Sequence, residues 1–147
     1  MQRRLMKVFN ALLVPLYRLS RGRIGSKLSW INVLLLTTTG RRTGKKRTTP
    51  LGYIKYEDNY VAMTGDTVNK IRPDWLYNLR SNPQVILEVK DRKLAALGSL
   101  VEREDRASFF EKLVDVEPRI MSEHNNYHAQ EIVIVIFRPV EQLTQIY

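Results

Sequence analysis

Apolar residues recur at helical spacing in the first twenty residues of the chain. They form one face of a helix predicted over residues 1–20: Leu5, Val8, Phe9, Leu12, Leu13 and Leu16. Arg3, Arg4, Lys7 and Arg18 accompany this face. The apolar run covers residues 8–17, whereas a span of a bilayer needs about 20 residues. Two interpretations stay open: the helix lies on an anionic membrane surface through residues 1–19, or its apolar face packs on the core of the protein.

β-branched and apolar runs predict six strands after a polar linker at residues 21–29. The runs occupy residues 31–39, 47–56, 59–64, 84–90, 94–103 and 132–137. Short intervals at Glu57-Asp58 and Asp91-Arg92 predict two hairpins. Helices are predicted over residues 73–80 and 104–121, and Pro118 is expected to kink or split the second.

This order of elements predicts a mainly β protein of the α+β class. Residues 30–147 are expected to form one domain, an antiparallel barrel or rolled sheet of about six strands with an N-terminal helix and inserted helices. A chain of 147 residues fits one core. A Rossmann-type sheet is disfavoured because the strands do not alternate with helices and no Gly-x-Gly-x-x-Gly motif occurs.

Positive charge is concentrated in the first third of the chain. The net charge is +9, and residues 1–56 contain 13 Lys and Arg but no acid. This asymmetry favours an anionic partner for that segment: nucleic acid, a membrane surface or a phosphorylated cofactor. The chain has no cysteine, which excludes disulfides and thiolate chemistry and fits a reducing compartment.

The charge peaks in the segment between the first two predicted strands. Residues 41–47 contain five cations, flanked and interrupted by Gly40 and Gly44. The glycines permit a tight turn that brings backbone N–H groups close to an anion. The segment is not a Walker loop, because the glycine spacing is one residue short and Lys46 stands where Ser or Thr is required. A solvated basic hairpin tip is the alternative interpretation.

Two separated motifs resemble the deazaflavin-dependent nitroreductase and F420H2-dependent quinone reductase family. The first runs from Thr37 to Gly44 with Arg47 and Pro50, and the second is Pro73-x-Trp75-x-x-Asn78-Leu79-x-x-Asn82-Pro83. The resemblance covers residues 32–89 and, more loosely, extends to Pro139. It implies a split β-barrel that binds coenzyme F420, the cofactor that supplies the hydride in this family.

The resemblance also implies which residues form the site. The phosphate and the polyglutamate tail of F420 would be held by Arg41, Arg42, Thr43, Gly44, Lys45 and Arg47. The ring system would be approached by Pro50, Leu51 and Gly52, with Thr64, Gly65 and Asp66 on its other side and Trp75 beside the pocket. Trp75 also fits a core anchor for the short helix, and Asn78 and Asn82 fit capping or turn residues without ligand contact.

The chain departs from the family pattern at two places. Asp66 places an acid near the expected phosphate. The substrate-pocket tyrosines of the nitroreductase branch correspond by position to Glu117, Ile120 and Glu123, so activation of nitroimidazoles is not carried over. The substrate pocket is therefore expected to involve Trp75, Ile120 and Tyr127.

Three classes of function follow. The favoured one is an F420-dependent oxidoreductase that reduces quinone-like, nitro or enone-type small-molecule acceptors. The second is an FMN-binding split-barrel flavoprotein, and the third is a basic binding module for a membrane surface or nucleic acid. Nucleic acid is disfavoured, because the few aromatics near the basic segment show no alternating stacking pattern.

The remaining expectations concern metals, location and assembly. No metal site is expected, since His124 and His128 have only Glu123 and Glu131 as nearby additional ligands. The protein is expected in the cytoplasm, with peripheral contact at the inner face of the cell membrane as the alternative. A homodimer is compatible with the sequence.

Overall fold

A computed structural model of the chain describes residues 2–65, 73–121 and 132–140. Three helices lie within these residues: α1 (Gln2–Leu19), α2 (Asp74–Ser81) and α3 (Arg106–Val116), the last preceded by a 3-10 turn at Arg103–Asp105. The strands are β1 (Lys27–Leu28), β2 (Ile31–Thr39), β3 (Lys46–Tyr56), β4 (Asn59–Gly65), β5 (Gln84–Val89), β6 (Arg92–Leu100) and β7 (Ile132–Pro139).

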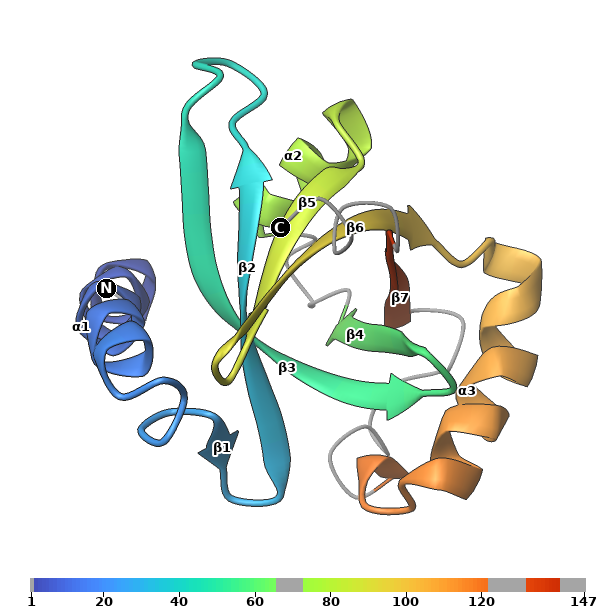
Figure 1. Cartoon of the computed structure of the whole chain (residues 1–147). Helices are drawn as coiled ribbons and strands as arrows, with labels where there is room; N and C mark the ends of the chain where they lie inside the picture. Colours follow the sequence, from blue (N-terminus) through green and yellow to red (C-terminus); the bar gives the residue numbers. More distant parts are fainter. Residues whose placement is uncertain (1, 66–72, 122–131, 141–147) are drawn as a thin grey trace.

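Six of the strands close into an antiparallel barrel (Figure 1). Their order is β2-β3-β4-β7-β6-β5, and β5 pairs back onto β2 with Leu36 opposite Leu87. β1 pairs with the first residues of β2, beside the seam where β5 joins it. The predicted mainly β architecture of about six antiparallel strands with an N-terminal helix and inserted helices is confirmed.

Most element boundaries agree with the predictions to within a few residues. The β3–β4 hairpin turns at Glu57-Asp58 as predicted, while the β5–β6 turn lies at Lys90-Asp91, one residue before the predicted position. Lys90 takes the left-handed conformation there, with a φ of 57°. The helix predicted over 104–121 is split near Pro118 as expected, since α3 ends at Val116 and the chain is helical again at Ile120 and Met121. The two-residue strand β1, in the predicted linker, was not predicted.

The barrel interior is filled by alternate side chains of its strands, and α2 closes one end. Leu34, Leu36, Val133, Val135 and Phe137 belong to this interior core, together with Trp75, Leu76 and Leu79 of α2. On the outer side of β4 and β7, α3 packs Phe110 and Leu113 against Val61, Ile132 and Ile134. β7 is therefore buried on both faces, as its uninterrupted apolar run predicts.

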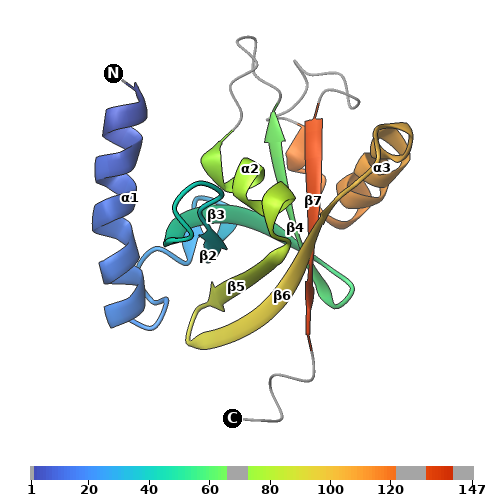
Figure 2. The ribbon, with the colours of Figure 1, turned by 90° about the horizontal axis from the view of Figure 1, so that it is seen from above.

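The helix α1 stands beside β2 and β3, on the opposite side of the barrel from α3 (Figures 1 and 2). Among the apolar side chains of α1 that the structure describes, Leu13 and Tyr17 are buried, Tyr17 completely. Leu5 and Leu12 are 67% and 64% exposed, and Val8, Phe9, Leu16 and Leu19 are exposed as well. The interpretation in which the apolar face of this helix packs on the core is therefore wrong for most of that face.

Candidate functional site

The basic loop between β2 and β3 is a compact turn. The Gly40 N–H donates to the Lys45 carbonyl oxygen at 2.8 Å, and the Gly44 N–H donates to the Gly40 carbonyl oxygen at 2.9 Å. Gly44 has a φ of 70°, a conformation that glycine adopts without steric cost. The side chains of residues 41–47 are all exposed. The loop thus presents its cations on the outside of a turn that is closed by its own backbone.

The backbone amides of this loop are largely used within the protein. Besides the two glycines, the Arg41 N–H donates to Asn78 Oδ1 at 3.1 Å and the Lys45 N–H donates to Thr43 Oγ1 at 3.2 Å. These four N–H groups are not available to an anion, so the expectation of a backbone cradle is wrong for them. The positive charge of the loop resides in its side chains.

Asn78 connects this loop to α2. Its side chain is nearly buried, with 5% of its surface exposed. Its Oδ1 accepts from the Arg41 backbone, and its Nδ2 donates to Thr38 Oγ1 at 3.2 Å. Asn78 is therefore a buried link in the middle of a helix and not the capping residue that its sequence context suggests. Asn82 is the C-cap of α2, and its Oδ1 accepts from the Gln84 N–H at 3.1 Å, as expected for a turn residue.

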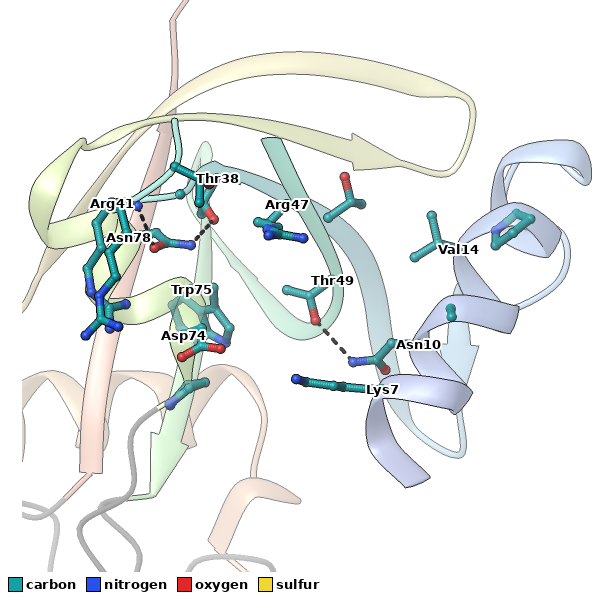
Figure 3. A pocket seen from close by; sticks show the side chains of 17 residues that line it. Lys7, Asn10, Val14, Thr38, Arg41, Arg47, Thr49, Asp74, Trp75 and Asn78 are labelled. Atoms are coloured by element: carbon teal, nitrogen blue, oxygen red, sulfur yellow. Dashed lines mark hydrogen bonds between the residues drawn. The ribbon is translucent and has the colours of Figure 1, made fainter. Parts of the chain in front are cut away.

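A cavity of about 850 Å³ lies between the basic loop, α2 and α1 (Figure 3). The end of β2, the loop and the start of β3 contribute Thr38, Gly40, Arg41, Arg42, Thr43, Arg47, Thr48 and Thr49. The start of α2 contributes Pro73, Asp74, Trp75 and Asn78, and α1 contributes Lys7, Asn10, Ala11, Val14 and Pro15. Segments distant in the sequence thus surround one space.

The lining of this cavity is strongly positive. It contains four cations, Lys7, Arg41, Arg42 and Arg47, and a single carboxylate, Asp74. Within the part of the chain that the structure describes, none of the four cations forms an ion pair. Arg41 lies over the Tyr77 ring, 4.8 Å from its centroid, an arrangement that leaves its charge uncompensated. The cavity is therefore suited to a ligand with several negative charges.

Trp75 is both a core residue that anchors α2 and a wall of the cavity. It belongs to the interior core with Leu76 and Leu79, and it also lines the cavity. Its exposed fraction is 9%. The core therefore fixes the orientation of the indole, and the remaining surface offers a rigid apolar wall to a ligand.

The structure brings together part of the residue set that the sequence predicts. Arg41, Arg42, Thr43, Arg47 and Trp75 line the cavity, whereas Gly44 and Lys45 lie in the same turn outside the lining. Pro50, Leu51 and Gly52 follow Thr49 along β3, and Thr64 and Gly65 end β4.

The predicted residues farther along the chain lie elsewhere. Ile120 is 1% exposed and packs with Phe110 and Leu113 in the core under α3, away from the cavity. Asp66, Tyr127, His124 and His128 lie outside the described residues. Within the described ranges, no three His, Asp or Glu side chains gather into a metal site.

The sequence interpretation missed the contribution of α1 to the cavity. Lys7, Asn10 and Val14 follow one another at intervals of three and four residues, so they share one face of the helix. That spacing is present in the sequence, but the helix was interpreted from the apolar residues on its opposite face. No helix in the described part of the chain is long and apolar enough to cross a bilayer.

Comparison with known proteins shows a family whose sequence model matches most of the chain, including most of the cavity lining. The sequence model of the F420H(2)-dependent quinone reductase family matches residues 11–139. An F420H(2)-dependent quinone reductase of Mycobacterium tuberculosis is 33% identical over 91 residues, 61% of this chain and 61% of that protein. The match therefore spans about three fifths of the length of this curated relative.

Solved structures show the same fold. The structure of an F420-H2 dependent reductase is 25% identical, with a TM-score of 0.55 over 71% of this chain and 92% of that chain. A structure described as a domain-swapped dimer is also 25% identical, with a TM-score of 0.57 over 72% of this chain and 79% of that chain. The barrel is thus the split β-barrel that the sequence motifs imply.

Proposed function

Because this chain belongs to the F420H(2)-dependent quinone reductase family, we propose that it is an F420-dependent oxidoreductase. Its substrate class in this proposal is a quinone-like or other conjugated small-molecule acceptor. The observation that carries the proposal is the cavity at the basic loop, whose lining has an excess of three positive charges. The chain segments that form it, apart from the first helical turns, lie within the matched residues 11–139.

The donor set of the cavity fits the charge of the cofactor. F420 carries a phosphate and an acidic polyglutamate tail, and guanidinium groups bind such oxygens with paired, charge-assisted hydrogen bonds. Arg41, Arg42 and Arg47 would hold these groups, with Thr43 at the edge of the turn. Asp74 lies at the α2 side of the same cavity, across from α1 (Figure 3).

The protein's own contribution to the reaction is orientation and exclusion of water. When bound, F420 supplies the hydride, which explains why the sequence needs no catalytic triad or metal cluster. Trp75 would act as a flat wall beside the reacting partners, fixed by its packing in the core. The hydrogen bonds of Asn78 hold the loop against α2 and so keep the cations in place before the ligand arrives.

Cofactor preference tests the proposal. We expect the protein to bind F420 at least tenfold more tightly than FMN, a difference of about 1.4 kcal/mol that one additional charge-assisted contact supplies. Quenching of cofactor fluorescence during titration measures both affinities. Equal or reversed affinities would contradict the F420 assignment and favour the alternative of an FMN-binding flavoprotein.

We further propose that α1 contacts the inner face of the cell membrane. The exposed apolar residues of α1 lie on the side away from the cavity, and the segment contains Arg3 and Arg4 but no acid. A helix with this composition binds anionic lipid through its apolar face and its charge. The alternative partner for this exposed apolar surface is a second copy of the chain, since one structural neighbour is described as a domain-swapped dimer.

A further inference from the structure

Apart from the buried Leu13 and Tyr17, the described apolar residues of the outward stripe of α1 point away from the barrel. In a helix that packs on a globular core, the apolar face points inward. In α1 the apolar residues at positions 5, 8, 9, 12, 16 and 19 are exposed, while Lys7, Asn10 and Val14 face the cavity (Figure 3). The inward face of the middle of α1 is therefore assembled as a wall of a polar site.

Polar contacts hold this wall in position. Arg18 forms a two-pronged ion pair with Glu88 of β5, with a shortest distance of 2.9 Å. About two turns earlier, Asn10 Nδ2 donates to Thr49 Oγ1 of β3 at 3.4 Å, across the edge of the cavity. The helix is thus fixed at its C-terminal end and in its middle, which determines where the preceding turn lies.

Lys7 lies on that preceding turn, three residues before Asn10. Figure 3 shows its side chain extending from α1 toward Trp75 and Asp74 on the opposite wall. Its amine makes no hydrogen bond or ion pair with any described residue. The rest of the lining carries three cations, Arg41, Arg42 and Arg47, against the single carboxylate Asp74, so the amine adds positive charge to a site that is already positive. An anionic ligand relieves that repulsion.

We infer that α1 is part of the cofactor site and that Lys7 binds the anionic portion of the cofactor from the side opposite the basic loop. This inference rests on the proposed F420-dependent function and extends it to an element that neither the charge motif nor the tryptophan motif includes. It also separates Lys7 from the lipid-facing residues of α1. The basic loop alone is then an incomplete site.

Titration of F420 fluorescence with three variants tests this inference. Lys7→Ala should weaken cofactor binding about five- to tenfold, equivalent to about 1–1.4 kcal/mol. Lys7→Arg should restore most of the affinity because it keeps the charge. The matched control is Lys27→Ala, which removes an exposed cation on β1 outside the cavity and should change the affinity little. The thermal midpoint of Lys7→Ala should equal that of the wild type, since the amine has no described partner.

A second titration locates the contact. If Lys7 binds the polyglutamate tail, Lys7→Ala and the wild type should bind cofactor without its tail equally well, and if it binds the phosphate the difference should persist. Both results support the inference. It is overturned if wild-type protein binds F420 while Lys7→Ala and Lys27→Ala behave alike. Failure of the wild type to bind F420 at all would instead contradict the proposed function.

Discussion

At the scale of single residues, the site depends on a buried amide and on exposed cations. Asn78 joins the Arg41 backbone to Thr38 through hydrogen bonds of 3.1 and 3.2 Å. The guanidinium groups of the loop arginines form no ion pair with any carboxylate in the described part of the chain. The backbone of the loop is therefore fixed while its charged groups remain available, which is the preorganisation that favours tight anion binding.

Arg47 offers the most direct test of the loop. It lies at the start of β3 and lines the cavity. Arg47→Ala should lower F420 affinity by about ten- to a hundredfold, since each charge-assisted contact contributes about 1.5–3 kcal/mol where water is excluded. The loss should shrink as salt is raised, because salt also screens the wild-type interaction. Fluorescence titration at several ionic strengths measures both effects.

Lys27→Ala is again the control for Arg47→Ala. If the two variants bind F420 equally well, the loop is a solvated hairpin tip and the assignment of the cofactor site is wrong.

At the scale of the element, α1 combines two surfaces of different chemistry. Its inward side is anchored through Tyr17, Arg18 and Asn10, and its outward side exposes six apolar side chains. An exposed apolar stripe of this length is unfavourable in water and indicates a partner. The proposed partner is an anionic lipid surface. Removal of the whole helix would be a poor test, because it also removes the anchors that hold α1 to the barrel.

Substitutions on the outward side of α1 avoid that difficulty. The double variant Leu5→Glu/Leu12→Glu keeps every described anchor and places charge on the lipid-facing side. Wild-type protein should sediment with phosphatidylglycerol vesicles at low salt, and the double variant should not. Leu97→Glu, an exposed apolar position on β6 of the barrel, should sediment like the wild type.

Size-exclusion chromatography tests whether a second copy of the chain, instead of lipid, covers the outward side of α1. If the wild type does not sediment and instead elutes as a dimer that the double variant dissociates, the outward side binds a second copy of the chain. Equal sedimentation of wild type and double variant would show that these leucines do not contact lipid.

At the scale of the whole molecule, Tyr17 ties α1 to the seam that closes the barrel. Its hydroxyl donates to the Val33 carbonyl oxygen of β2 at 3.0 Å and accepts from the Lys90 N–H of the β5–β6 turn at 2.7 Å. The strands β2 and β5, which close the barrel, pair only over a short register, from Leu35 to Thr37 of β2. The buried hydroxyl thus extends the connection between β2 and β5 beyond their own hydrogen bonds.

Stability at alkaline pH reports on this contact. Burial raises the pKa of the Tyr17 hydroxyl above its usual value of 10.0, with the Lys90 hydrogen bond opposing and Glu88 adding to the shift. A raised pKa means that the folded state holds the proton more tightly, so its contribution is complete below pH 10 and is lost as the pH rises through the folded pKa. The free energy of unfolding should therefore fall above pH 10.

Tyr17→Phe provides the comparison for that pH dependence. At neutral pH the variant should be less stable by about 1–3 kcal/mol, because the Lys90 N–H loses its partner in a buried position. Its alkaline decline should be shallower than that of the wild type. Urea unfolding at pH 7 and at several values above pH 10 measures both quantities, and parallel declines would show that the pKa of Tyr17 is the same in the folded and unfolded states.

The barrel strands, the helices and the positive charge of the loop could be predicted from the residues alone. β-branched and apolar runs specified the six barrel strands, and the short interval at Glu57-Asp58 specified the β3–β4 hairpin, because strand preference and turn chemistry are properties of neighbouring residues. Five cations beside two glycines indicated an anion site, and the resemblance to the family implied that Trp75 lies beside the pocket. These features are local, so they could be predicted without knowledge of the fold.

Which surfaces of these elements contact one another could be learned only from the folded chain. The helical spacing of α1 defines an apolar face and a face with Lys7, Asn10 and Val14, but it does not state which of them points inward. That choice follows from Tyr17, Arg18 and Asn10, whose partners Val33, Glu88 and Thr49 are distant in the sequence. The role of Asn78 depends in the same way on Thr38 and Arg41. Contacts between distant segments arise from closure of the barrel, so the local periodicity of the sequence does not predict them.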